Sequence, residues 1–102
     1  MVIGRNVLVA SNVFIIDYNH GLNLLTMSYL ENPLIRGVFV DDGVWIGNDV
    51  IVLPNVHIGK KSIIGAGSVV TKDIPEYCIA VGNPAKVIKK FYIKEKKWKQ
   101  VL

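Results

Sequence analysis

The chain has 102 residues, 51% hydrophobic and 20% charged, so it is long enough for one domain and too apolar for a disordered segment. Its apolar runs are much shorter than the roughly 20 residues of a membrane-spanning helix, and no secretory signal is visible. We therefore expect a single folded domain over residues 1–102, without membrane insertion. The one cysteine, Cys78, excludes an internal disulfide and favours a reducing compartment, the cytoplasm.

The net charge of +4 is concentrated at the C-terminal end. Residues 86–102 contain seven lysines and one acidic residue, whereas residues 1–85 have a small excess of acidic residues. A basic tail can attract an anionic partner. Solvent-facing lysines are the simpler interpretation, because no nucleic-acid-binding motif accompanies them, and we expect no nucleic-acid partner.

A repeat of six residues organises the chain from Val40 onward. An aliphatic residue stands at every sixth position, and a small or apolar residue follows four positions after each. The aliphatic row is Val40, Ile46, Val52, Ile58, Ile64 and Val70, and the second row is Val44, Val50, Val56, Ser62, Ser68 and Ile74. The same phase recurs near the start in Ile3, Val9 and Ile15. An α-helix cannot place residues six apart on one face, since six steps of about 100° end about 240° from the start.

A short strand and a tight corner in every repeat explain this pattern. The aliphatic residue points inward, and a glycine such as Gly47, Gly59 or Gly65 relieves crowding at the bend. Three sides close a triangular coil, and coils stacked about 4.8 Å apart bury a continuous apolar core. The pattern predicts an all-β fold, a parallel β-helix. The expected coils are residues 3–20, 40–57 and 58–75.

Two segments fall outside the repeat. The pattern fails between residues 20 and 37, which predicts an extruded loop over 21–37, and its apolar content indicates packing over a neighbouring subunit. The C-terminal extension over 84–102 is rich in lysine and aromatic residues. We expect a strand returning along the coils over 86–92 and a short amphipathic helix over 93–102 that covers the open end of the solenoid.

Three stretches resemble the hexapeptide-repeat acyltransferases, most closely the maltose/galactoside and polysaccharide-modifying sugar O-acetyltransferases. They are Gly43-Val44-Trp45-Ile46-Gly47, residues 64–75 and residues 81–88. The resemblance, rather than the spacing, implies a left-handed coil, a homotrimer with active sites between subunits, acetyl-CoA as the donor and a sugar hydroxyl as the acceptor. Enzymes of that family are longer and begin with further coils, so we expect a fragment or a compact variant.

His20, at the root of the excursion, is the candidate catalytic residue. Imidazole is the side chain best suited to accept a proton near neutral pH, and an acceptor hydroxyl needs a base when it attacks a thioester. In the resembling family, a histidine matching His20 is that base. The residues alone leave open a turn histidine bonded to local backbone. Asp17 either orients the ring or makes an Asx-turn at a corner.

The resemblance also implies the donor site. Contacts to the pantetheine arm of coenzyme A would come from Asn48, Ala66, Thr71 and Lys72, and contacts near its phosphates from Lys86 and Lys89. Plain corner residues and solvated lysines are the alternative interpretations. Trp45 is either a wall of the site or a packed corner aromatic.

Other functions leave weaker signals. β-Helical carbonic anhydrases bind zinc through three histidines, but this chain has only two, His20 and His57, and we predict no metal. His57 occupies an ordinary corner, where exposure to solvent is expected. Cys78 is expected to be a small buried residue rather than a nucleophile. A catalytically inactive β-helical oligomerisation module is the second functional hypothesis.

Overall fold

Short parallel strands stacked in successive coils form most of the protein. The computed structural model describes residues 1–17, 20–23, 28–31 and 37–101, with side chains in the first and last of these ranges. The first coil holds β1 (Val2–Ile3), β2 (Leu8–Val9) and β3 (Phe14–Ile15). The second holds β6 (Phe39–Val40), β7 (Trp45–Ile46) and β8 (Ile51–Val52), and the third holds β9 (His57–Ile58), β10 (Ile63–Ile64) and β11 (Val69–Val70).

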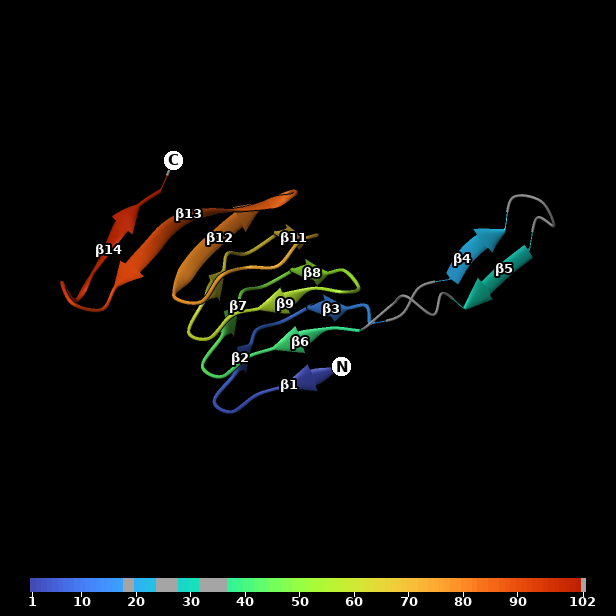
Figure 1. Cartoon of the computed structure of the whole chain (residues 1–102), viewed down its shortest axis with the longest axis horizontal. Coiled ribbons are helices and arrows are strands. Elements are labelled where there is room, and N and C mark those ends of the chain that lie inside the picture. Colours follow the sequence, from blue (N-terminus) through green and yellow to red (C-terminus); the bar gives the residue numbers. More distant parts are fainter. Residues whose placement is uncertain (18–19, 24–27, 32–36, 102) are drawn as a thin grey trace.

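The coils stack into three flat faces, as a triangular β-helix requires (Figure 1). The faces are β1-β6-β9, β2-β7-β10 and β3-β8-β11, all paired in parallel. Phe39 pairs with His57, a step of 18 residues, whereas Val2 pairs with Phe39, a step of 37 residues. The longer step is one residue more than two coils, so the inserted segment keeps the inward residues of the first coil in phase with the rest.

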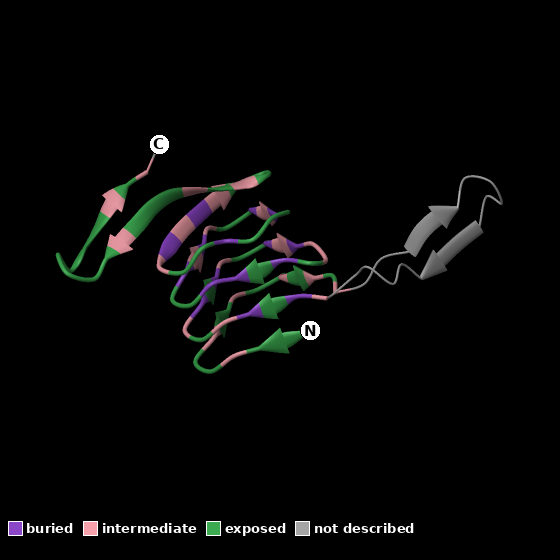
Figure 2. Ribbon diagram, viewed as in Figure 1, coloured by how far each residue is buried: buried purple, intermediate pink, exposed green. Residues whose placement is uncertain are grey.

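The predicted aliphatic row forms the core. Each of its six members, Val40, Ile46, Val52, Ile58, Ile64 and Val70, has no exposed surface. The second row is buried as well, and Figure 2 shows both rows along the inside of the coils. The two buried serines of that row satisfy their hydroxyls locally, because Ser62 donates to the Pro75 carbonyl and Ser68 donates to the Gly65 carbonyl, each at 2.6 Å.

The corners use two different devices. The glycines that follow the aliphatic row allow close stacking, as predicted: a Cβ on Gly47 would lie 2.9 Å from the backbone nitrogen of Ala66 in the next coil. A second device was not predicted. A residue in the left-handed region of φ turns the chain at intervals of six, namely Gly37, Gly43, Asp49, Asn55, Lys61 and Gly67.

The C-terminal extension is entirely β structure in its described part. β12 (Cys78–Gly82) runs parallel to β10, and β13 (Ala85–Tyr92) returns antiparallel along β12, which confirms the predicted strand over 86–92. The predicted helix over 93–102 is wrong, because β14 (Lys97–Gln100) pairs with β13 instead. A ten-residue helix is marginal without packing, whereas strand pairing places the Trp98 ring 5.2 Å from the Phe91 ring.

The predicted excursion contains a two-stranded hairpin. β4 (His20–Asn23) and β5 (Ser28–Glu31) pair antiparallel in a sheet of their own. The rest of the excursion and its side chains lie outside the described residues, so its expected packing over a neighbouring subunit stays a prediction. Within the described ranges, no helix has the length and apolar character needed to cross a membrane.

Candidate functional site

Two residues predicted to contact the pantetheine arm lie at one corner of the helix. The Asn48 side-chain oxygen accepts a hydrogen bond from the backbone N–H of Ser11 at 2.9 Å, and its carbonyl accepts one from the backbone N–H of Gly67 at 2.8 Å. Asn48 therefore ties the first, second and third coils together at this corner. Ala66, next to Gly67, is exposed beside it, so backbone groups and a small side chain line this edge.

The predicted phosphate-binding lysines lie on β13, which continues the same face. Lys86 is paired with Val81, and Val81 contacts Gly65, the residue before Ala66. Both Lys86 and Lys89 are exposed. The register therefore brings Lys86 toward the corner that carries Ala66, an arrangement suited to a ligand with an extended neutral arm and an anionic end.

Trp45 lies on the outward side of β7, between Leu8 of the first coil and Ile63 of the third. Its side chain is 49% exposed. Trp45 is thus not a packed corner aromatic in this chain, and its ring belongs to an apolar row on the outside of the face that leads to the Asn48 corner.

The remaining predicted residues occupy the next corner of the coil. Thr71 and Lys72 follow β11 and are exposed. The Asp17 carboxylate pairs with the N-terminal ammonium group of Met1 at 3.2 Å, so its described partner is not an imidazole. The structure places the six predicted donor contacts along two successive corners rather than at one.

His20 begins β4 and pairs through its backbone register with Glu31. Its side chain lies outside the described part of the structure. The predicted role of His20 as the general base is therefore not tested by the geometry.

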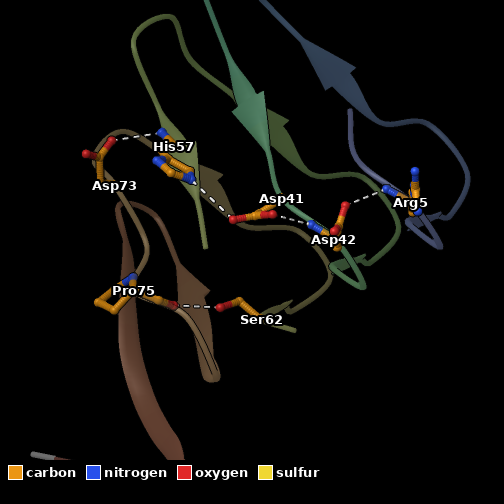
Figure 3. Close-up of polar contacts among 7 residues, drawn as sticks. All are labelled: Arg5, Asp41, Asp42, His57, Ser62, Asp73 and Pro75. Carbon is orange, nitrogen blue, oxygen red and sulfur yellow. Dashed lines mark hydrogen bonds and ion pairs between the residues drawn. The ribbon is translucent and has the colours of Figure 1, made fainter. Parts of the chain in front are cut away.

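A polar cluster that the sequence interpretation did not identify surrounds His57 (Figure 3). Its Nε2 atom lies 3.8 Å from a carboxylate oxygen of Asp41, and its backbone N–H donates to the Asp73 carboxylate at 2.8 Å. Its ring meets the Phe39 ring edge-on, with centroids 4.7 Å apart. Asp41 and Asp73 lie 16 residues before and after His57, close to one coil, and this spacing was the available signal.

Two hollows of about 310 Å³ flank this cluster. The first is lined in part by Lys60 and Glu76, the second by Met1 and Phe39, and both include His57 and Asp73. A half-exposed imidazole beside a carboxylate can exchange protons with solvent. Among the residues that the structure describes, no three His, Cys, Asp or Glu side chains gather as a metal site.

The Cys78 thiol is buried, as expected, at the start of β12. Burial raises its pKa above the ordinary value, Lys90 opposes that effect and Glu76 adds to it. The thiol also lies 3.4 Å from the Glu76 carbonyl, to which it donates. A buried thiol with a raised pKa is a poor nucleophile, so Cys78 is a packing residue.

The comparisons with known proteins agree with this architecture. Residues 37–72 match the model of the bacterial transferase hexapeptide family, described as six repeats. The solved maltose O-acetyltransferase of Clostridium difficile 630 is similar with 44% identity and a TM-score of 0.72, over 85% of this chain and 46% of that one. A variant of AntD, an N-acyltransferase of Bacillus cereus solved with dTDP-4-amino-4,6-dideoxyglucose and coenzyme A, is similar with 25% identity and a TM-score of 0.73, over 92% of this chain and 54% of that one.

The chain belongs to the hexapeptide-repeat transferase family, and its coil is a left-handed parallel β-helix, as the resemblance implies. Protein YJL218W of Saccharomyces cerevisiae is 46% identical over 96 residues, which are 93% of this chain and 48% of that protein. The galactoside O-acetyltransferase of Lactococcus lactis is 54% identical over 55 residues, 54% of this chain and 27% of that enzyme. The chain spans about half the length of the curated relatives that match most of it.

Proposed function

We propose that the protein transfers an acetyl group from acetyl-CoA to a sugar hydroxyl. The observation that carries the proposal is the match over most of the chain to a maltose O-acetyltransferase, at 44% identity. The match to a galactoside O-acetyltransferase supports the same acceptor class. The edge formed by Asn48, Ala66 and Lys86 is consistent with a coenzyme A thioester lying along the coils.

In this proposal, transfer is direct and forms no acyl-enzyme. His20 accepts the proton of the sugar hydroxyl while the oxygen attacks the thioester carbonyl, and backbone N–H groups at a corner hold the oxyanion. The new carbon–oxygen bond replaces the carbon–sulfur bond, and coenzyme A leaves as its thiolate. The protonated imidazole then returns the proton to that sulfur, so the base is regenerated.

A homotrimer is the proposed assembly. The outward positions of the strands are apolar and exposed on more than one face: Leu8 is 59%, Phe14 64% and Trp45 49% exposed. Large exposed apolar surfaces mark association sites. Assembly would also let donor contacts at two corners, such as Ala66 of one copy and Lys72 of another, serve one ligand. We place the reaction in the cytoplasm, in agreement with the unpaired Cys78.

The experiment is a thiol-release assay with acetyl-CoA and a panel of sugars. We compare the wild type with His20→Ala and with the matched control His57→Ala. Loss of turnover only in His20→Ala supports the proposal, whereas loss only in His57→Ala moves the base to the Asp41 cluster. Silence in all three proteins overturns the enzyme and favours the inactive oligomerisation module, which the half-length match to the relatives would explain. Elemental analysis of the purified protein tests the expectation that no metal is bound.

A further inference from the structure

A row of aromatic side chains crosses the C-terminal hairpin. The rings of Tyr77 and Phe91 stack with centroids 6.4 Å apart at an interplanar angle of 25°, and the rings of Phe91 and Trp98 lie 5.2 Å apart at 45°. The three residues come from the segment before β12, from β13 and from β14, at the far edge of the molecule in Figure 1. The row is part of neither the core nor the proposed donor edge.

A hollow of about 460 Å³ opens over this row. It is lined by Lys61, Tyr77, Phe91, Ile93 and Trp98. Its volume lies within the range of about 300–1,000 Å³ typical of small-ligand sites. Trp98 keeps 38% of its surface exposed and Ile93 keeps 60%, so aromatic and aliphatic faces are available to a ligand. Lys61 adds a cation at the wall.

A second hollow of about 400 Å³ shares Tyr77, Phe91 and Ile93 with the first. Its wall is charged with both signs, through Lys90, Lys94, Glu76 and Glu95. The Lys90 and Lys99 ammonium groups lie 5.8 Å and 4.9 Å from the Tyr92 ring centroid, which keeps cations on the hairpin surface. Residues 86–102 contain seven lysines and one acidic residue, so the surface is strongly cationic overall.

We propose that this aromatic and basic hairpin binds an anionic glycan, a sugar chain that carries carboxylate or phosphate groups. Flat aromatic side chains present an apolar face to the C–H face of a sugar ring, and lysines pair with the anionic substituents. The inference rests on the proposed function in one respect, because the glycan would belong to the class of the acetyl acceptor.

The mixed charge favours a glycan over a nucleic acid. A polynucleotide is recognised by a continuous positive groove that follows its phosphates. Here the carboxylates of Glu76 and Glu95 stand in the second hollow. They would repel a dense polyanion, but they can accept hydrogen bonds from sugar hydroxyls between widely spaced charges.

Affinity electrophoresis of the whole chain tests the proposal without any turnover. Gels contain a polyuronate, a phosphate-bearing glycan, neutral dextran or single-stranded DNA. We expect retardation by one or both charged glycans, and the stronger of the two identifies the anionic group. Retardation by dextran alone, strongest retardation by DNA, or no retardation in any gel overturns the proposal. The enzymatic proposal can fail in the thiol-release assay while glycan binding persists.

Paired variants locate the surface. Trp98→Leu keeps apolar bulk on β14 and removes the aromatic face, so we expect about tenfold weaker glycan binding, in line with the value of one stacking contact. Lys61→Gln is expected to weaken binding about threefold to tenfold. The matched control Lys60→Gln removes the same charge outside the first hollow and should bind like the wild type. Binding unchanged in both Trp98→Leu and Lys61→Gln, with a native circular dichroism spectrum, would place the glycan elsewhere and contradict the proposal.

Discussion

The His57 imidazole lies 3.8 Å from the Asp41 carboxylate, and the two residues come from successive coils. Their side chains are 52% and 36% exposed, so solvent screens the pair. Exposed ion pairs typically contribute less than about 1 kcal/mol to stability. We therefore expect Asp41→Asn to change the free energy of unfolding by less than about 1 kcal/mol, as measured by urea titration. A larger loss would mean that this pair, rather than the apolar row beneath it, holds the coils together.

The apolar row should contribute unequally along the solenoid. Val52 has no exposed surface, whereas Val9, at the matching position of the first coil, is 41% exposed. Removing two buried methyl groups costs the transfer free energy and leaves a cavity. Val52→Ala should lower the free energy of unfolding by about 2 kcal/mol and Val9→Ala by less than about 1 kcal/mol. Equal losses would show that Val9 is covered in solution, as in an assembly.

The left-handed corners can be tested at Gly67. Its φ is +73°, and a Cβ built there meets nothing within 4 Å, so Gly67→Ala introduces backbone strain without a steric clash. We expect a loss of about 1–2 kcal/mol. Gly67→Asn should recover part of it, because asparagine tolerates this conformation better and already occupies the equivalent corner as Asn55. Thermal unfolding of both variants measures the difference, and equal stability of the wild type and Gly67→Ala would contradict the corner geometry.

The buried thiol predicts a dependence of stability on pH. Because burial raises the pKa of Cys78 in the folded protein, the unfolded chain ionises first as the pH rises. The stabilising contribution is complete at neutral pH and decreases above the ordinary thiol pKa, about 8.5. We expect the stability of the wild type relative to Cys78→Ala to fall between pH 7 and pH 10 in denaturant titrations. A difference that stays constant over this range would mean that the thiol is solvated.

The proposed assembly predicts a change of mass on substitution. Phe14 is 64% exposed on the outward side of β3. If the outward faces meet in a trimer, light scattering should give the mass of three chains, and Phe14→Glu should shift the population toward the monomer because it buries a charge. A monomeric wild type would contradict the homotrimer.

Much of the fold was predictable because the buried row recurs with one period and tolerates only aliphatic residues. The hairpin at the C-terminal end was not, since a short segment with apolar residues such as Trp98 and Val101 fits a helix or a strand until its partner is known. The left-handed corners were missed because they hold residues as different as Gly43, Asp49 and Lys61.

The candidate site was predictable only in part. Asn48 and Ala66 meet because they follow the repeat through one coil, and that spacing is visible in the sequence. The contact between His57 and Asp41 depends on a step of 16 residues between corners, which differs from the 18-residue register of the strands. No period in the sequence indicates such an offset.

Equilibrium binding of acetyl-CoA to the purified chain, measured by calorimetry, tests the central claim most directly. We expect saturable binding to the wild type and about tenfold weaker binding to Ala66→Leu, because a larger side chain would fill the edge proposed for the pantetheine arm. Lys60→Gln should bind like the wild type. Absence of binding to the folded wild type, or undiminished binding to Ala66→Leu, would contradict the acyl-transfer account.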